Sequence, residues 1–287
     1  MMRGPDLGPI GVWSMELRRA DRAEAREAAN ELDELGFGAI WMPGGMDAHE
    51  ILDDVSDMLA HTRRAVIATG IINIWTTTPE MVGTWWRTLS ASDRGRVQLG
   101  VGVSHGPAIP EYNKPLSHMR AYLDALDAQG IPPHNRCIAA LSPKMLELSA
   151  TRTAGTHPYN VPVEHTSYAR ALIGPDALLA PEVGVILEEN PDQARAKARA
   201  WLQLYMRLPN YRNNWMRFGF SEEEVAAESD RLIDALFVWG SNERIAEGVR
   251  RHLDAGADHV NVQVVDGPMN FTSLPREHWR RLAAILL

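Results

Sequence analysis

The segment AVIATGIINIWTTTPEMVGTWWRTLSASDRGRVQLGVGVSH, residues 65–105, contains two hydrophobic runs separated by a helical pattern. The first run, 66–74, is rich in β-branched residues and is long enough for one buried strand; the second is 97–103. Between them, Pro79 is placed where a helix can begin without losing a hydrogen bond. Two strands joined by a helix pair in parallel through a right-handed crossover. The segment therefore predicts a strand–helix–strand unit.

Patterns of the same kind recur along the rest of the chain. Apolar runs bounded by turn residues predict about eight strands alternating with helices, which favours a (β/α)8 barrel over an open sheet. The expected strands are residues 10–13, 37–42, 66–74, 97–103, 136–141, 157–159, 183–187 and 259–265. No compositional break marks a linker, so we expect one domain over residues 1–287.

One segment interrupts the alternation. Residues 208–220, LPNYRNNWMRFGF, are rich in aromatic residues, Asn and Arg. Long insertions in barrels usually form lids or binding loops, so we expect an insertion here that covers the site.

Composition excludes several classes of function. The net charge of −8 argues against a general nucleic-acid surface, because phosphate binding needs a basic field. The single cysteine, Cys137, rules out an intramolecular disulfide framework. No apolar run is long enough for a membrane span or resembles a signal peptide, so the expectation is a cytoplasmic protein without a membrane partner.

Short motifs in the first 105 residues occur in a specific order. They are Glu34–Leu35–Gly36–Phe37, Ile40–Trp41–Met42–Pro43, Ala68–Thr69–Gly70–Ile71, Leu89–Ser90, Arg94–Gly95–Arg96 and Leu99–Gly100–Val101–Gly102. This ordered set resembles the bacterial luciferase-like family of flavin and deazaflavin enzymes. The rest of the chain is similar to the subfamily of coenzyme F420-dependent oxidoreductases, through Met119–Arg120–Ala121–Tyr122–Leu123–Asp124, Leu208–Pro209–Asn210–Tyr211 with Asn213–Asn214, and Asp254–Ala255–Gly256–Ala257–Asp258–His259–Val260.

The resemblance implies a flat cofactor, F420 or alternatively FMN, whose ring lies on a bulged third strand. It places a non-proline cis peptide bond at Gly70–Ile71. The cofactor phosphate is expected in the loop after the fifth strand, where helix N–H groups face an anion. The candidate cofactor-binding residues are Gly70, Ile71, Asn73, Gly102, Val103, His105, Ala139, Ala140, Leu141 and Ser142.

Two of these residues depart from the family pattern. Leu141 and Ser142 stand where many relatives have glycines. Ser142 adds a hydroxyl donor for a phosphate, but it is equally compatible with a plain helix cap.

His105 is the candidate catalytic residue, because histidine titrates near neutral pH and can move a proton near the ring. A hydrogen-bonding role without catalysis remains the alternative. Relatives carry an acidic residue or histidine after the second strand, whereas this chain has Gly44 and Gly45. Asp47 or His49 is a possible replacement, and altered or lost activity is the other outcome.

The remaining aromatic and histidine residues divide into pocket and packing candidates. Trp13, Gly44, Trp75 and Tyr211 are the candidate substrate-pocket residues, whereas Trp85 and Trp86 are expected to pack in a helix. His61, His252 and His278 are expected on solvated helix surfaces, and the histidine spacing predicts no metal site.

A homodimer is expected from the resemblance. Apolar residues of the early helices beyond the needs of one face, Ile51, Met58, Trp85 and Trp86, are consistent with it.

Three functions follow from these observations. The first is transfer of a hydride between F420 and a small organic substrate. The second is an FMN-dependent monooxygenase. The third is a catalytically impaired relative that acts as a binding protein, for which Gly44, Gly45 and Leu141 are the evidence.

Overall fold

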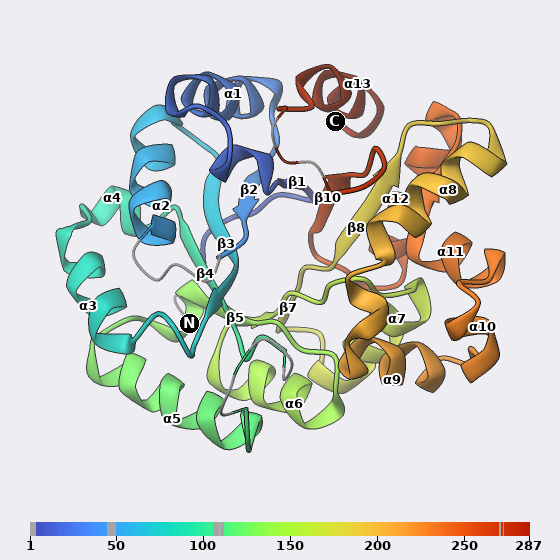
Figure 1. Cartoon of the computed structure of the whole chain (residues 1–287). Coiled ribbons are helices and arrows are strands. Elements are labelled where there is room, and N and C mark those ends of the chain that lie inside the picture. The colour runs from blue at the N-terminus through green and yellow to red at the C-terminus, as the bar shows by residue number, and fades with distance from the viewer. Residues whose placement is uncertain (1–3, 45–49, 106–108, 110–111, 270, 272) are drawn as a thin grey trace.

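The computed structural model describes residues 4–44, 50–105, 109, 112–269, 271 and 273–287. Within these residues, thirteen α-helices surround one parallel sheet of ten strands (Figure 1). The strand order is β7-β6-β5-β4-β3-β2-β1-β10-β8-β9. The strands are β1 (Ile10–Trp13), β2 (Ala39–Met42), β3 (Val66–Asn73), β4 (Val97–Gly102), β5 (Arg136–Ile138), β6 (Gly155–Thr156), β7 (Leu178–Leu179), β8 (Glu182–Ile186), β9 (Phe237–Trp239) and β10 (Val260–Val264).

The helices follow the strands along most of the chain. They are α1 (Arg22–Leu35), α2 (Glu50–His61), α3 (Pro79–Thr88), α4 (Ala91–Arg94), α5 (Pro115–Ala128), α6 (Pro143–Arg152), α7 (Val163–Ile173), α8 (Pro191–Leu202), α9 (Pro209–Arg217), α10 (Glu222–Ala226), α11 (Asp230–Leu236), α12 (Asn242–Asp254) and α13 (Arg276–Leu286). Among the described residues there are also the 3-10 turns η1 (Glu16–Arg18), η3 (Pro133–Asn135) and η4 (Tyr205–Arg207). No helix among the described residues is both long enough and apolar enough to cross a membrane.

The sheet curls round because β7 and β8 are nearly continuous. Only Ala180 and Pro181 separate them, yet β7 pairs with β6 and β8 pairs with β10. The chain itself thereby joins β7, at one end of the strand order, to β8, next to the other end, and α1 packs beside α13 (Figure 1). The curled parallel sheet is consistent with the predicted TIM barrel.

Three strand predictions are corrected. The fifth strand ends at Ile138 rather than at residue 141, because the chain then turns into α6, with Pro143 in its first turn. The sixth strand is Gly155–Thr156 and does not extend over 157–159, since Pro158 has no N–H to continue the ladder. Strands β7 and β9 lie outside the predicted set of eight; β7 pairs with β6 and β9 pairs with β8.

Local signals account for the ends of the helices. The side chain of Asp21 accepts hydrogen bonds from the N–H groups of Ala23 and Glu24 at the start of α1. Gly36 ends the same helix in the left-handed region at φ 99°. Thr78 caps α3, and Pro79 occupies its first turn as predicted.

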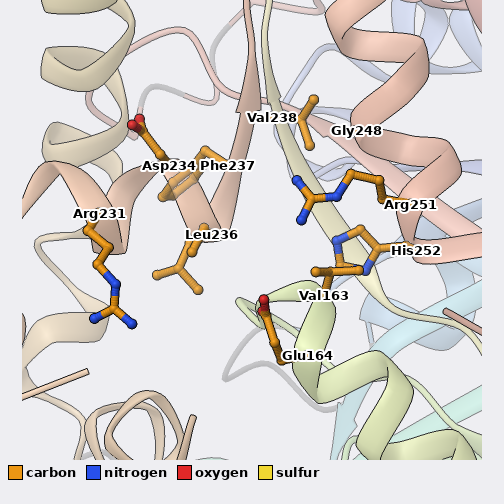
Figure 2. A pocket seen from close by; sticks show the side chains of 11 residues that line it. Val163, Glu164, Arg231, Asp234, Leu236, Phe237, Val238, Gly248, Arg251 and His252 are labelled. Carbon is orange, nitrogen blue, oxygen red and sulfur yellow. The ribbon is translucent and has the colours of Figure 1, made fainter. Parts of the chain in front are cut away.

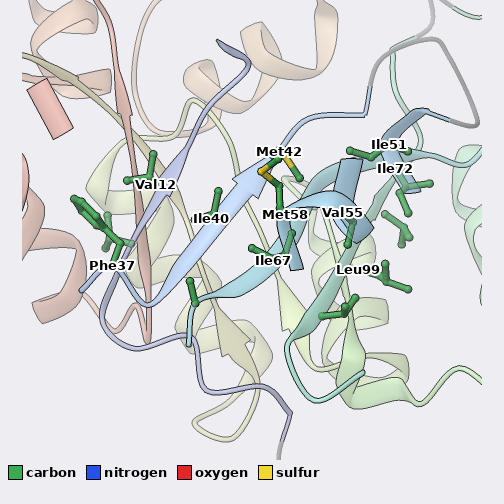
Figure 3. Close-up of a cluster of buried hydrophobic side chains, with 14 of the residues drawn as sticks. Val12, Phe37, Ile40, Met42, Ile51, Val55, Met58, Ile67, Ile72 and Leu99 are labelled. Carbon is green, nitrogen blue, oxygen red and sulfur yellow. The ribbon is translucent and has the colours of Figure 1, made fainter. Parts of the chain in front are cut away.

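The largest hydrophobic core lies between the strands and the helices. Side chains from β1 to β4 pack there against α2, and Figure 3 shows Ile40, Met42 and Ile67 facing Val55 and Met58. Trp85 and Trp86 are buried in this core, as expected. Ile51 and Met58 are also buried within the chain, so these four apolar residues do not support the expected homodimer.

Candidate active site

The third strand is irregular where the cofactor bed was predicted. The pairing of β3 with β4 shifts register between Thr69 and Ile72, and the Gly70–Ile71 peptide bond is cis. The indole N–H of Trp13, at the end of β1, donates a hydrogen bond of 3.0 Å to the carbonyl oxygen of Gly70. The predicted bulge and cis bond are both present, and β1 supports the bulge through Trp13.

Glycines on the neighbouring strands make room for this bulge. A Cβ atom at Gly102 would lie 2.8 Å from Cδ1 and Cγ1 of Ile71 and 3.4 Å from Cβ of Ala139. The Ile71 side chain therefore lies against β4 and next to the loop after β5. The structure thus brings together Ile71, Gly102 and Ala139, three of the predicted cofactor-binding residues.

Gly44 also contacts the bulge, through its backbone. Its N–H donates to the carbonyl oxygen of Ile71 at 2.9 Å, and a Cβ atom at Gly44 would lie 2.3 Å from the same oxygen. A side chain at position 44 would therefore displace the bulge, which gives a physical reason for glycine at this position of this chain. Gly45, Asp47 and His49 lie outside the described residues.

Asn73 and Trp75 shape the turn that follows β3. Asn73 is buried, and its side-chain oxygen accepts a hydrogen bond of 3.1 Å from the N–H of Trp75. The indole N–H of Trp75 donates to the carbonyl oxygen of Val103 at 2.7 Å, and its ring packs on His118. These contacts join the loop after β3 to the loop after β4. Trp75 and Trp13, both predicted as pocket residues, make their contacts with different residues.

His105 lies at the carboxyl end of β4, beneath α9. Its ring centroid is 5.5 Å from that of Tyr211, and its Nδ1 is buried without a hydrogen-bond partner in the described part of the chain. Burial lowers the pKa of His105, and a side-chain hydrogen bond with Asn210 opposes this shift. A mainly neutral imidazole in this position is able to accept a proton.

Helix α9 occupies the segment that was predicted as an insertion, residues 208–220. Tyr211 packs on His105 after β4, Arg217 donates to the carbonyl oxygen of Leu141 after β5 at 3.3 Å, and Trp215 donates to that of Asn160 after β6 at 3.0 Å. The helix therefore covers three consecutive strand ends. Tyr211 and Trp215 are buried in a second core with α8 and α11, so the segment is a packed helix.

The loop after β5 leads into α6, where Pro143 has no N–H group and the N–H groups of Met145 and Leu146 donate to the carbonyl oxygen of Ser142. Ser142 stands at the N-cap position, but its hydroxyl makes no capping hydrogen bond, so the plain-cap interpretation is not supported. Ala140 is buried, and Ser142 is exposed. Arg217 adds a cation beside this loop, since its guanidinium reaches the oxygen of Leu141. The hydroxyl, the helix start and the guanidinium fit an anion such as a phosphate.

A hydrogen-bonded polar cluster around two half-buried tyrosines at the barrel mouth was missed. The hydroxyl of Tyr205 donates to that of Tyr159 at 2.9 Å, and Tyr159 donates to Oε1 of Gln263 at 2.9 Å. Glu182, at the start of β8, is 2% exposed in the same region. Tyr159 also packs on Trp13, with ring centroids 5.6 Å apart. The sequence feature that could have indicated this cluster is Glu182, a carboxylate at the first position of an otherwise apolar strand, β8.

Deeper in the barrel, histidines and aromatic rings fill the interior. His157 stacks on Trp41 at 4.3 Å, and its Nδ1 lies 2.7 Å from the carbonyl oxygen of Ala180. Trp41 donates to Nε2 of His259 at 3.2 Å. Burial lowers the pKa of His157 to about 4, so the ring is neutral at pH 7. The ring of His157 lies directly against Gly70, since a Cβ atom at Gly70 would be 2.9 Å from its Nε2. This layer of side chains therefore contacts the β3 bulge from inside the barrel.

A separate pocket of ≈ 360 Å³ lies outside the barrel, between α7, α11, β9 and α12 (Figure 2). It is lined by Glu164, Asp234 and Arg251, among others, and contains none of the predicted site residues. His252 also lines it and corrects an expectation, because this histidine is buried rather than solvated. Its Nδ1 lies 2.9 Å from the hydroxyl of Thr166 on α7, and burial lowers its pKa to about 4.

The fold and the cluster at the strand ends define a barrel-type α/β protein with its candidate site at the carboxyl face. The sequence matches the profile of the luciferase-like monooxygenase family over residues 7–129 and 112–259. The chain belongs to this family. A comparison with curated proteins finds no match.

Solved structures share the fold at low sequence identity. An F420-dependent secondary alcohol dehydrogenase in complex with an F420–acetone adduct is 12% identical, with a TM-score of 0.70 and 98% of each chain covered. The coenzyme F420-dependent tetrahydromethanopterin reductase from Methanopyrus kandleri is 14% identical, with a TM-score of 0.72 over 98% of this chain and 99% of that one. The oxygenating constituent of 3,6-diketocamphane monooxygenase from Pseudomonas putida, in complex with FMN, is 14% identical, with a TM-score of 0.67 over 98% and 97%. F420-dependent enzymes and FMN-dependent monooxygenases therefore share this fold.

Proposed function

We propose that the chain is an F420-dependent oxidoreductase that moves a hydride between the deazaflavin and a small organic substrate. The observation that carries the proposal is the β3 bulge. Trp13 and Gly44 hold it from β1 and β2, and it presents Ile71 beside Gly102 and Ala139 at the mouth. The family resemblance assigns the same residues to the bed of a flat cofactor ring.

The residues at the mouth fit such a cofactor. The bulge would support one face of the ring, and the Ser142 hydroxyl with the start of α6 and Arg217 would hold its phosphate. When bound, F420 supplies a carbon centre that accepts or donates a hydride. The protein then has to position the ring and handle protons. His105 would accept a proton near the ring, since it lies at the end of β4 and burial lowers its pKa, which leaves the imidazole neutral.

The experiment is a titration of the purified protein with F420 and with FMN, followed by tryptophan quenching and by cofactor absorbance. We expect saturable binding of F420 that is tighter than that of FMN. Ser142→Ala should weaken binding roughly threefold or more, because a hydrogen bond to a charged group is lost. Ser92→Ala, on the exposed α4, serves as the control and should bind normally.

Other outcomes of the titration lead to other functions. Preferred binding of FMN would favour the monooxygenase, a function carried by the FMN-bound neighbour of the same fold. Binding of neither cofactor would favour the impaired relative, for which Gly44 in place of a polar residue is the evidence.

The same proposal includes the organisation of the molecule: a single domain over residues 1–287, cytoplasmic, and a homodimer. The dimer rests on the family resemblance alone, because the apolar residues of α2 and α3 are buried within the chain. Light scattering should give twice the chain mass of 31.9 kDa at micromolar concentration, and a monomer there would count against the dimer.

A further inference from the structure

The pocket outside the barrel has an apolar lining that is largely buried. It lies beside β9, the last strand of the strand order, and is bounded by α7, α11 and α12. Leu236 and Phe237, which line it, are 5% and 2% exposed, and Val163 and Val238 are half-buried. Its volume of ≈ 360 Å³ is ordinary for a site that holds a small molecule. The charged groups around this lining indicate which kind of molecule would fit.

Arg251 brings a positive charge to the pocket. Its side chain extends from α12 into the pocket (Figure 2). The guanidinium group forms no ion pair and no hydrogen bond with any residue that the structure describes. Arg231, which also lines the pocket, is paired with Glu224 at 2.9 Å. Of these two arginines, Arg251 is therefore the one whose donors are all available to a ligand.

Glu164 brings a negative charge from another wall. It is the second residue of α7, and its side chain reaches into the pocket (Figure 2). Within the described part of the chain, its carboxylate forms no ion pair, with Arg251 or any other cation, and no hydrogen bond. The other acidic lining residue, Asp234, is neutralised, because Arg195 donates to its two oxygens at 3.0 and 2.6 Å. The pocket thus presents one cation and one anion that are both free to bind a ligand.

His252, next to Arg251, adds a buried donor to the same wall. It lines the pocket and is 5% exposed, and its Nδ1 lies 2.9 Å from the hydroxyl of Thr166, which is fully buried. A buried hydroxyl needs an acceptor for its proton, and Nδ1 is the acceptor that the described residues offer it. The hydroxyl therefore donates, and the proton of the neutral ring lies on Nε2. Since Nε2 has no hydrogen-bond partner among the described residues, its N–H is available to a ligand.

Together these groups suit a small zwitterion. A carboxylate has two oxygens, which match the guanidinium of Arg251 and the Nε2–H of His252. An ammonium group has three donors, which match the carboxylate of Glu164. A simple anion would be repelled by Glu164, and a simple cation by Arg251, so a ligand with both charges fits better than a ligand with one. The apolar lining then suits a hydrocarbon side chain on the same molecule.

We propose that this outer pocket binds a free α-amino acid with an apolar side chain. Its carboxylate lies on Arg251 and His252, its ammonium group lies on Glu164, and its side chain packs on Leu236 and Phe237. The site is separate from the candidate active site, because none of the predicted cofactor-binding or substrate-pocket residues lines it. Binding therefore requires neither the cofactor nor the reaction proposed above.

The first test is calorimetric titration of the whole protein with L-leucine, L-methionine and L-phenylalanine. We expect saturable binding of at least one of them, with one site per chain. For leucine as the bound probe, 4-methylpentanoate lacks the ammonium group and L-leucinamide lacks the carboxylate, and each should bind roughly tenfold more weakly or worse. For methionine or phenylalanine, the matching carboxylic acid and amide serve the same purpose. The absence of saturable binding of all three amino acids up to about 10 mM would overturn the proposal, as would equal binding of either analogue.

Two variants test the charged groups one at a time. Arg251→Gln and Glu164→Gln should each weaken amino-acid binding roughly tenfold or more, because each removes one charged contact. Arg250→Gln is the control for the first, since Arg250 is exposed on α12 and does not line the pocket. Glu277→Gln is the control for the second, since Glu277 is exposed and is the second residue of α13, as Glu164 is of α7. Both controls should bind normally, and full affinity in either pocket variant would refute the zwitterion site.

Combining the variants with the analogues assigns each ligand group to its residue. In Arg251→Gln, the amino acid and its amide should bind about equally, because the partner of the carboxylate is gone. In Glu164→Gln, the amino acid and the acid without an ammonium group should bind about equally for the corresponding reason. Thermal unfolding of each variant shows whether the fold is kept. A folded variant that still discriminates its analogue as the unaltered protein does would overturn the assignment.

Discussion

The indole N–H of Trp13 donates a hydrogen bond of 3.0 Å to the carbonyl oxygen of Gly70, 57 residues further along the chain. This bond joins the end of β1 to the bulge of β3. The ring of Trp13 also packs on Tyr159, so one side chain connects the β3 bulge with the hydrogen-bonded pair Tyr159 and Tyr205. The position of the bulge therefore depends on a residue from another strand.

Trp13→Phe should weaken cofactor binding, because the Gly70 carbonyl loses its donor. A typical hydrogen bond contributes about 1 kcal/mol, so we expect roughly a fivefold rise in Kd by fluorescence titration. Trp239→Phe is the matched control, since its indole donates to Asp234 at 2.9 Å on the outer side of the barrel. Equal losses in the two variants would contradict the role of Trp13.

His105→Ala should leave cofactor affinity nearly intact and slow the chemical step by about a hundredfold, the scale of a lost general acid or base. If His105 only anchors the cofactor, affinity should fall by about 1–3 kcal/mol while the bound rate is unchanged. Stopped-flow measurement at saturating cofactor separates the two. His61→Ala, at the exposed end of α2, should change neither quantity.

Acid should destabilise the protein through three buried histidines, His157, His165 and His252. Burial lowers the pKa of each to about 4, whereas the unfolded chain takes up the proton near the ordinary value of 6.5. The unfolded state therefore binds more protons between about pH 6.5 and pH 4, and stability falls as pH falls through this window.

His252→Gln checks this relation. The loss of unfolding free energy between about pH 7 and pH 4.5 should be smaller than in the unaltered protein by roughly 3 kcal/mol, measured by urea titration. His61→Gln should show the same loss as the unaltered protein. An identical pH dependence in both variants would refute the assignment.

Glu182→Gln should stabilise the protein at alkaline pH. The pKa of Glu182 is raised in the folded state to about 8, from 4.5, so its stabilising effect is complete below pH 4.5 and is lost as pH rises to about 8. Gln has no proton to lose, so the variant should gain about 4 kcal/mol relative to the unaltered protein between those limits. Parallel curves of stability against pH would argue against a buried neutral Glu182.

A bound cofactor should protect the packed helix α9 from amide exchange. Tyr211 and Trp215 are buried in its contacts with the strand ends, so a bound cofactor that fills the mouth should slow amide exchange over Pro209–Arg217. Hydrogen exchange with and without F420 measures this change. Helix α12, Asn242–Asp254, is the internal reference and should exchange equally in both states; equal exchange in α9 would contradict its role as a cover.

Part of the candidate site could be predicted from local sequence patterns. The unit from Val66 to Gly102 was predictable because its strand periods, the Thr78–Pro79 helix start and the strand glycines act over a few residues. The bulge at Gly70–Ile71 followed from the family motif rather than from strand propensity, and the structure confirms it.

The burial of individual side chains did not follow in the same way. His252 occupies a position on α12 that a helical pattern assigns to the surface, yet Thr166 of α7 covers it. Gly44 was expected as a pocket residue, whereas its N–H supports Ile71. The burial of His252 and the contact of Gly44 both depend on the neighbouring element, α7 in the first case and β3 in the second, which local sequence does not specify.

The sequence by itself determined the family, the alternation of strands and helices, and the strand ends that carry the candidate residues, because these depend on local periodicity and ordered motifs. Only the tertiary structure decided that the hydroxyl of Tyr159 bonds to Gln263, since the two residues are 104 positions apart and meet only when the barrel curls. The same holds for the raised pKa of Glu182, because burial is a property of the packed interior and not of the chain.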